Sequence, residues 1–312
     1  MKRSGVDSEI CAGDSGRPQT GRMRAVRAGS SRRSGAPGLR RCCATLVSAA
    51  VWAATALTAA GCDRVFEYHP YDVRITGACD INAGNAARIE TITAGRTSFR
   101  FAVISDTQRR YDETEDAVRA LNGRRDLDFV VHCGDLSDFG VGREFMWQRD
   151  MLQKLNVPYV CVLGNHDCLG SGEQAYRRIF GPYDYAFTAG DVRFVCLNTN
   201  AGEYDYVADV PDFGFLSGEL AAVPSEARRT VFVMHVPPYD PIFNNNVAAF
   251  FEEQLLAFPE PIFAVFGHQH RMRVFEPFDD GLLYYGCTDI ADRQYLVFTV
   301  DETGYACETV AF

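Results

Sequence analysis

The chain has 312 residues, enough for one large domain or two small ones, and its 47% apolar and 23% charged residues exclude a disordered chain, a collagen-like repeat and a multispan membrane bundle. Residues 1–41 contain ten Lys or Arg and three Asp or Glu, so residues 42–312 contain 21 against 38, a net charge of −17. We expect no nucleic-acid binding from so acidic a body, because a phosphate backbone is bound by cations.

The N-terminal region predicts export and lipid anchoring. Residues 1–38 are rich in Arg, Ser and Gly without apolar periodicity, so we expect no fold there. Arg40-Arg41 then precede the uncharged stretch Ala44–Ala60 and the pair Gly61-Cys62, an order typical of a signal peptide that ends like a bacterial lipobox. Residues 1–61 are therefore interpreted as a basic leader plus signal peptide. A transmembrane anchor is the alternative, but the stretch is short and only mildly apolar.

We accordingly expect a bacterial protein that is exported and held in the cell envelope by a lipid on Cys62, with no other contact with the membrane. Seven further Cys follow Cys62, an odd number with no CxxC pair, which argues against a disulfide framework and a thiolate zinc site. Cys133, Cys161 and Cys196 lie in apolar runs and are expected to be buried small hydrophobic residues.

Residues 62–98 read as a polar lead-in segment, with a strand expected at Val73–Thr76 and a short helix at Asn82–Thr91. From Phe99 onward, apolar β-branched runs alternate with amphipathic stretches. We expect strands at Phe101–Ser105, Phe129–Cys133, Tyr159–Leu163, Phe194–Asn198, Val231–His235 and Ile262–Phe266, and helices at Glu113–Leu121, Arg143–Leu155, Glu173–Phe180, Phe213–Ala222 and Val247–Phe258. Strands this apolar are typical of sheets that are covered on both faces.

The C-terminal part has a different pattern. Leu282–Tyr285, Tyr295–Val300 and Ala306–Val310 predict an antiparallel meander, with its turn at Asp301–Gly304. The coarse architecture is therefore an α/β core that finishes in β-hairpins.

The expected strands are followed by polar side chains. These are Asp106 and Gln108 after the first strand, Asp135 and Asp138 after the second, Asn165 and His166 after the third, and then His235, His268 and His270. Because carboxyl ends of parallel strands meet at one edge of a sheet, we expect these side chains to share one crevice. Carboxylates, imidazoles and an amide oxygen suit Mn, Fe or Zn, and one Asp can bridge two ions. Taken singly, Asp106, Asp135 and Asn165 could also be turn or cap residues.

In order and spacing, these residues resemble the motifs D-x-H, G-D-x-x, G-N-H-[D/E], a lone His and G-H-x-H of the calcineurin-like metallophosphoesterase superfamily, over residues 99–270. The resemblance implies an α/β fold, a four-layer αββα sandwich of mixed sheets with a dinuclear metal site at the carboxyl ends of strands. It makes residues 99–312 the catalytic domain of a metal-dependent hydrolase of phosphate esters, in which a hydroxide that bridges the metals attacks phosphorus. The substrate would be a phosphorylated small molecule, with monoester, diester and pyrophosphate all open.

The resemblance also implies a role for each residue. Asp106, Gln108 and His270 would bind metal one, Asn165, His235 and His268 would bind metal two, and Asp135 would bridge the two ions. His166 would contact the phosphate or protonate the leaving oxygen, and Asp138 would orient His166.

Two positions depart from the family pattern. Gln108 stands where the family usually has His, so metal one is expected to bind more weakly or with a different selectivity. Phe139 stands where protein phosphatases of the family have an Arg that clamps phosphate, which argues against phosphoprotein phosphatase activity. Arg109, Arg110 or Arg271 could supply that cation from another loop.

Two histidines lie outside the motifs. His132 precedes Cys133 within an expected strand and is interpreted as a core residue or a support for a ligand, and His69 is interpreted as a loop contact. The alternative function, from a different class, is a non-catalytic envelope lipoprotein that keeps the fold to bind a ligand or a partner. Loss of metal ligands would favour that alternative, and only Gln108 departs from the expected set.

Overall fold

The computed structural model describes His69 and residues 72–312. The predicted leader and signal peptide, residues 1–61, and the predicted lipid-anchored Cys62 lie outside the described residues. Within the described part, no helix is long and apolar enough to cross a membrane.

The first sheet contains three parallel strands, β1 (Phe99–Ile104), β2 (Phe129–His132) and β3 (Tyr159–Cys161), which the antiparallel hairpin of β10 (Gln294–Asp301) and β11 (Gly304–Ala311) extends beside β1. The second sheet contains β5 (Val192–Cys196), β6 (Arg229–Val233), β7 (Pro261–Phe266) and β9 (Tyr284–Gly286), all parallel, with antiparallel β4 (Tyr185–Ala189) and β8 (Arg273–Phe275) at its edges. Among the described residues, the orders are β11-β10-β1-β2-β3 and β4-β5-β6-β7-β9-β8.

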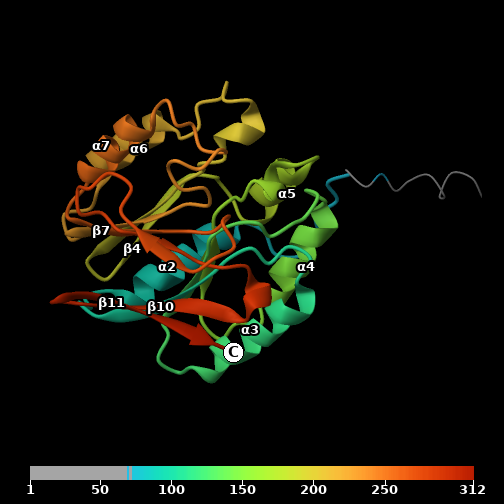
Figure 1. The fold of residues 1–312 in the computed structure, drawn as a ribbon. Coiled ribbons are helices and arrows are strands. Elements are labelled where there is room, and N and C mark those ends of the chain that lie inside the picture. Colours follow the sequence, from blue (N-terminus) through green and yellow to red (C-terminus); the bar gives the residue numbers. More distant parts are fainter. Residues whose placement is uncertain (1–68, 70–71) are drawn as a thin grey trace, which may run out of the picture. The chain divides into compact units, whose positions relative to one another are not determined.

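Helices cover the outer face of each sheet. They are α3 (Tyr111–Gly123), α4 (Gly142–Leu152) and α5 (Gly172–Ile179) on the first sheet, and α6 (Phe213–Ala222) and α7 (Ala248–Leu256) on the second. Figure 1 shows α3 and α4 on one side of the strands and α6 and α7 on the other. The layers are therefore helix, sheet, sheet and helix, which confirms the predicted αββα sandwich. Three short 3-10 helices lie in the described loops, at His166–Cys168, Ala201–Tyr204 and Ile290–Asp292.

The sandwich follows from strands that are apolar on both faces. In β1, Phe99, Phe101 and Val103 face the second sheet, and the alternating Ala102 and Ile104 face the helices. The core between the sheets is built largely from phenylalanines: the ring centroids of Phe101 and Phe194 lie 5.3 Å apart in a perpendicular arrangement.

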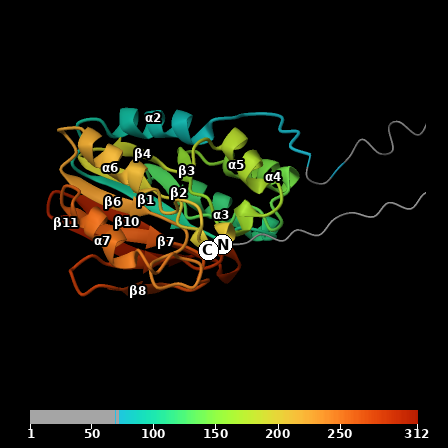
Figure 2. The same ribbon diagram turned by 90° about the horizontal axis from the view of Figure 1, so that it is seen from above.

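Helix α2 (Ile81–Thr93) lies where β3 and β4 form the neighbouring edges of the two sheets (Figure 2). Asn82 donates to the carbonyl of Cys161 and accepts from its N–H, both at 2.9 Å, and Asn85 donates to the carbonyl of Tyr159 at 2.7 Å. These bonds satisfy the edge groups of β3, where the Cys161 carbonyl also accepts from the hydroxyls of Tyr176 and Tyr185. The predicted helix of the lead-in segment is thus confirmed, and it is part of the packed body.

Two sequence predictions are wrong. Val73–Thr76 is not a strand: Val73 and Ile75 pack against the outer core but join no ladder. The run Leu282–Tyr285 contributes β9, which does not belong to a C-terminal meander with β10. Instead β9 lies parallel to β7, whose edge would otherwise carry unpaired backbone groups. The short edge strands β4 and β8 were not predicted from the sequence.

Helix α7 buries a carboxyl group against the second sheet. Glu252 is 2% exposed, and the hydroxyl of Tyr284 on β9 donates a hydrogen bond to it. Burial raises the pKa of Glu252 to about 7, although the bond from Tyr284 opposes the shift; the nearby charge of Asp280 adds to it.

We predict that Glu252→Gln stabilises the protein at pH 8 and has little effect at pH 4. The folded-state pKa lies above that of Glu in an unfolded chain, so the free energy of unfolding falls as the pH rises from the unfolded-state pKa to about 7, and it stays lowered above that pH. Gln keeps the shape and can still accept from Tyr284. Urea unfolding should give a gain on the order of 1–3 kcal/mol at pH 8. The exposed neighbour in Glu253→Gln is the matched control, and equal gains at both pH values would contradict the prediction.

Candidate metal centre

The seven predicted ligands follow five strands of both sheets. Asp106 and Gln108 follow β1, Asp135 follows β2, Asn165 follows β3, His235 follows β6, and His268 and His270 follow β7. Because these strands are parallel within each sheet, their carboxyl ends deliver the side chains to one place. The structure therefore brings together residues that are up to 164 positions apart.

Contacts between polar atoms, one of them through a backbone N–H, connect all seven residues into one cluster. They join Gln108 Nε2 to Asp135 Oδ2 at 3.1 Å, Asp135 Oδ1 to His235 Nε2 at 3.3 Å, His235 Nε2 to Asn165 Oδ1 at 3.1 Å, Asn165 Oδ1 to His268 Nδ1 at 3.0 Å, the backbone N of His268 to Asp106 Oδ2 at 3.1 Å, and Asp106 Oδ1 to His270 Nε2 at 3.1 Å. No predicted ligand lies apart from the others.

The cluster contains two carboxylates away from water. Asp106 is 0% and Asp135 1% exposed. Burial alone would raise the pKa of Asp135 and lower that of His235, but the opposite charges of the two groups outweigh it. The pKa of Asp135 is lowered, and that of His235 is raised to about 9. The site thus needs positive charge, which a proton on His235 supplies in part and a metal cation could supply in its place.

The donor set fits a metal ion. Asp106, Asp135 and His235 each offer a ligand atom within 4.8 Å of the other two. Gln108 turns its amide nitrogen to Asp135, and its buried Oε1 has no hydrogen-bond partner among the described residues. A divalent cation beside these oxygens and imidazoles would give that amide oxygen the positive partner that the protein does not provide.

The histidines of the cluster have a second partner on the other ring nitrogen. His268 Nε2 lies 3.1 Å from Asp240 Oδ1, His270 Nδ1 lies 3.7 Å from Asp289 Oδ2, and His235 Nδ1 lies 2.7 Å from the carbonyl oxygen of Cys133. Such partners fix the ring orientation and raise the basicity of a metal-binding histidine. Burial would raise the pKa of Asp240, but bonds from His268 and Gln269 lower it to about 2, so this partner is a carboxylate.

Asn165 is oriented in the same way. Its amide nitrogen lies 3.3 Å from Glu203 Oε1, on the 3-10 helix at Ala201–Tyr204, and its Oδ1 faces His235 and His268. Glu203 therefore favours the amide orientation in which oxygen, the atom able to bind a metal, points into the cluster.

His166 lies at the edge of the cluster and contacts none of the seven side chains through its ring in the bonds described. Its Nδ1 lies 3.0 Å from the carbonyl oxygen of Asp138 and 3.6 Å from Oδ1 of the same residue. A carbonyl oxygen only accepts hydrogen bonds, so Nδ1 carries a proton and Nε2 is the nitrogen left for other chemistry. The sequence prediction that Asp138 orients His166 agrees with this geometry, and the backbone carbonyl makes the shorter contact.

Asp167 holds two loops of the site together. Its carboxylate accepts hydrogen bonds from the N–H groups of Leu136, Ser137 and Gly164 at 3.2, 2.7 and 2.9 Å. Burial and the charge of Asp135 raise the pKa of Asp167 to about 7, against these donors. The loop after β2 and the loop after β3 thus keep a fixed relation, which sets the position of Asp135 relative to Asn165.

The backbone at the site is held in an uncommon conformation. Four of the predicted ligands have positive φ: Asp106 (54°), Asp135 (60°), His268 (65°) and His270 (49°). Gly164 and Gly267 have no room for a side chain. A Cβ at Gly164 would lie 2.2 Å from Asp135 Oδ1, and a Cβ at Gly267 would lie 2.0 Å from the hydroxyl of Ser105. Strain of this kind concentrates at functional sites.

His132 is a core residue, as predicted. It is fully buried, and its Nε2 and Nδ1 bond to the Thr107 hydroxyl at 2.9 Å and the Gly134 N–H at 3.2 Å. Burial lowers the pKa of His132 to about 4, so the ring is neutral and supports the loops after β1 and β2.

An open pocket of about 200 Å³ adjoins the cluster. Gln108 and His270 of the cluster line it, together with His166, Arg109, Arg110 and Asp289. This is the place where a molecule could meet the ligands and His166 at once.

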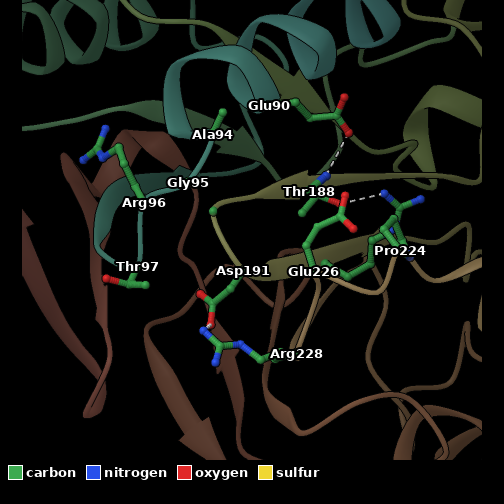
Figure 3. Close-up of a pocket in the computed structure, with 12 residues that line it drawn as sticks. Glu90, Ala94, Gly95, Arg96, Thr97, Thr188, Asp191, Pro224, Glu226 and Arg228 are labelled. Carbon is green, nitrogen blue, oxygen red and sulfur yellow. Dashed lines mark hydrogen bonds and ion pairs between the residues drawn. The ribbon is translucent and has the colours of Figure 1, made fainter.

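A larger cavity of about 570 Å³ lies at the other end of the strands, next to the start of β5 (Figure 3). Three of its arginines have acidic partners: Arg228 Nη2 lies 3.5 Å from Asp191, which also lines the cavity, whereas Arg193 and Arg96 pair with Glu219 and Asp128, which do not. Glu90 accepts a bond from the backbone N–H of Thr188, as Figure 3 also shows. None of the described residues that line this cavity is a predicted ligand or a histidine.

Sequence reasoning missed the supporting carboxylates. Asp167 lies within a recognised motif, so its position was a usable signal. Asp240, Glu203 and Asp289 follow no motif, and their loops give no periodic pattern from which their contacts could be read.

Comparison with known proteins adds independent evidence. A model of the calcineurin-like phosphoesterase family matches residues 99–272. The chain is 25% identical over 161 residues to a 3',5'-cyclic-nucleotide phosphodiesterase of Nostoc sp., a match that covers 47% of this chain and 58% of that relative, so the chain spans little more than half of the relative's length.

Two solved structures resemble the fold. One is a dimetal phosphatase from Danio rerio, with a TM-score of 0.53 and 16% identity over 69% of this chain and 99% of that one. The other is the anchor in the inner membrane complex of Plasmodium, with a TM-score of 0.52 and 16% identity over 69% and 85%. At these identities the likeness concerns the fold alone.

We predict that Asp240→Asn weakens metal binding without unfolding the protein. The variant keeps the shape of the side chain but loses the charge that faces His268, and loss of such a partner typically lowers metal affinity by roughly 10- to 100-fold. Titration of metal-free protein with Mn or Zn, followed by calorimetry, measures the affinity. Asp205→Asn, at an exposed position, is the control. Unchanged affinity in Asp240→Asn would rule out this role.

Proposed function

The chain belongs to the calcineurin-like phosphoesterase family, and on this premise we propose that it is a metal-dependent hydrolase of phosphate esters. One observation carries the proposal: seven residues from five strand ends form one connected cluster with the ligand chemistry of metal-assisted hydrolysis. The alternative, a non-catalytic envelope lipoprotein, has no need for this complete set, so the set supports an enzyme.

The proposed cofactors are two divalent or trivalent ions of Mn, Fe or Zn. Asp106, Gln108 and His270 would hold one, Asn165, His235 and His268 the other, and Asp135 both. When bound, such ions supply Lewis acidity and lower the pKa of water, so that hydroxide is available near neutral pH.

The protein's own contribution is positioning and proton transfer. Asp240, Asp289 and Glu203 hold ligands in one orientation, which limits reorganisation during the reaction. With Nδ1–H held by the carbonyl of Asp138, a second proton on the ring of His166 sits on Nε2, and this imidazolium form can deliver it to the departing oxygen and return to the neutral ring. Proton delivery matters most when the leaving group is a poor one.

The proposed substrate is a phosphorylated small molecule. The pocket beside the cluster, at about 200 Å³, is small and open, which supports binding of a phosphate group while the rest of the substrate extends outward. The relative from Nostoc is described as acting on cyclic nucleotides, so a cyclic nucleotide belongs among the candidates.

We further propose that the protein is exported and anchored in the bacterial cell envelope through Cys62. The support is the sequence order alone: Arg40-Arg41, the uncharged stretch Ala44–Ala60 and then Gly61-Cys62.

Hydrolysis assays with added Mn test the function. The panel contains p-nitrophenyl phosphate, bis-p-nitrophenyl phosphate, cyclic nucleotides and nucleotide sugars. The wild type should hydrolyse at least one, chelation should abolish the activity and Mn should restore it. Asp135→Asn should abolish activity and metal binding with an unchanged circular dichroism spectrum, since one carboxylate is proposed to serve both ions. Asp209→Asn is the exposed control, and a metal-loaded wild type that is inactive on the whole panel would contradict the proposal.

We predict that His166→Ala lowers kcat by on the order of 10²- to 10⁴-fold, the usual contribution of general acid–base catalysis. The metal content should stay at the wild-type level, because the ring is not among the proposed ligands. The loss should be smaller for a substrate that releases p-nitrophenolate, which needs less protonation. Paired assays on esters with good and poor leaving groups make this measurement; loss of metal, or the same loss for every leaving group, would refute the role.

For the anchor, we predict that the native protein begins at a lipid-modified Cys62. Mass spectrometry of protein from its own membranes should find no unmodified peptide that spans residues 60–63. Cys62→Ser should abolish the lipid modification, and recovery of the intact unmodified peptide from the wild type would show that the prediction is wrong.

A further inference from the structure

The structure separates the three arginines that the sequence offered as a phosphate-binding cation. Arg109 and Arg110 line the pocket that also contains His166 and His270. Arg271 is not among the residues that line it. The candidates for a phosphate-binding cation are therefore Arg109 and Arg110, which are adjacent on the loop that follows β1.

The two arginines that line the pocket have different ion-pair partners. Arg110 Nε lies 3.6 Å from Asp289 Oδ2, and Asp289 also faces His270. Arg109 Nη2 lies 2.5 Å from Asp138 Oδ1, a carboxylate that is 2% exposed at its side chain. Since a buried carboxylate needs a cation, this ion pair favours a position of the Arg109 guanidinium at the pocket, although neither Asp138 carboxylate oxygen has a hydrogen-bond partner among the described residues.

The Arg109 guanidinium, although paired with Asp138, still has N–H groups that can donate to a ligand. The Arg109 side chain is 63% exposed, and a guanidinium has five N–H donors in one plane, so the contact with Asp138 leaves others available. The exposed ring of Phe139 lies beside it, with its centroid 5.7 Å from Arg109 Cζ. This packing limits the orientations of the side chain without covering it.

Arg109 is also placed next to the proposed proton donor. The oxygen that it contacts, Asp138 Oδ1, lies 3.6 Å from His166 Nδ1, so the guanidinium and the imidazole flank the same atom. Arg109 itself has a φ of 63°, uncommon for a residue with a side chain, in the loop that carries Gln108. A phosphate that reaches His166 therefore passes within range of this cation.

We propose that Arg109 binds a non-bridging oxygen of the substrate's phosphate and makes the site prefer a phosphomonoester, or a terminal phosphate, over a diester. The inference rests on the proposed hydrolase function. A monoester has three non-bridging oxygens and a second negative charge, whereas a diester has two such oxygens and one charge. If metal ions held by the cluster engage two oxygens, only the monoester has a third for Arg109, and the bond is charge-assisted on both sides.

The test uses the metal-loaded protein and three variants. Arg109→Gln removes the charge, Arg109→Lys keeps it but loses the planar fork, and Arg119→Gln removes an exposed arginine of α3 as the control. Calorimetric titration with inorganic phosphate measures binding without any turnover. Assays on p-nitrophenyl phosphate and bis-p-nitrophenyl phosphate then measure KM and kcat for a monoester and a diester.

We expect Arg109→Gln to weaken phosphate binding roughly 10- to 100-fold, as loss of a hydrogen bond between charged groups does. KM for the monoester should rise more than KM for the diester, with metal content unchanged and a partial recovery in Arg109→Lys. Equal effects on both esters, or phosphate binding like that of Arg119→Gln, would overturn the inference.

Two further outcomes are distinguishable. If Arg109→Gln fails to fold because Asp138 loses its partner, Arg109→Lys carries the test: weaker phosphate binding and a smaller preference for the monoester than in the wild type support the inference, and values equal to those of the wild type overturn it. If the wild type binds metal and phosphate but hydrolyses no substrate of the whole panel, the proposed function fails, while the phosphate titration still decides whether Arg109 binds phosphate.

Discussion

Two carboxylates buried side by side are the constraint on which this structure depends. Asp106 and Asp135 follow the adjacent parallel strands β1 and β2 and are almost completely shielded from water. Like charges in such a place are unfavourable unless positive charge or N–H donors face them. The backbone N–H of His268, the backbone N–H of His166 and the ring of His235 provide part of this compensation. The remaining need for positive charge is what gives the cluster its capacity for metal.

The two-sheet architecture explains how this compensation is assembled. The first sheet supplies the carboxylates and amides, and the second supplies all three histidines of the cluster, so neither sheet alone contains a complete set of ligands. The phenylalanine core between the sheets, with Phe101 against Phe194 and Phe263, fixes their spacing. A close-packed interior of this kind resists small displacements, and ligand atoms from opposite sheets consequently keep their separation.

Charge is distributed to suit an anionic ligand in an acidic protein. The net charge of −17 over residues 42–312 would repel phosphate, so local cations must overcome it. Arg109 and Arg110 lie at the pocket beside the cluster, each paired with a carboxylate, Asp138 or Asp289, that holds it there. The larger cavity at the opposite ends of the strands has arginines too, each also paired with a carboxylate, but none of the predicted ligands lines it. Proximity to the buried ligand cluster and His166, and not cavity size, distinguishes the candidate site.

The sequence by itself determined the parts of this protein that depend on local pattern. Apolar runs predicted six strands, and the polar residues directly after them predicted the ligands, because a strand end controls where the next side chain goes. Only tertiary structure decided the rest. It placed β9 beside β7 instead of β10, since strand pairing depends on which edge is open. It also chose Asp240 and Glu203 as supports and Arg109 over Arg271 at the pocket, since loop contacts between distant residues leave no periodic signal in the chain.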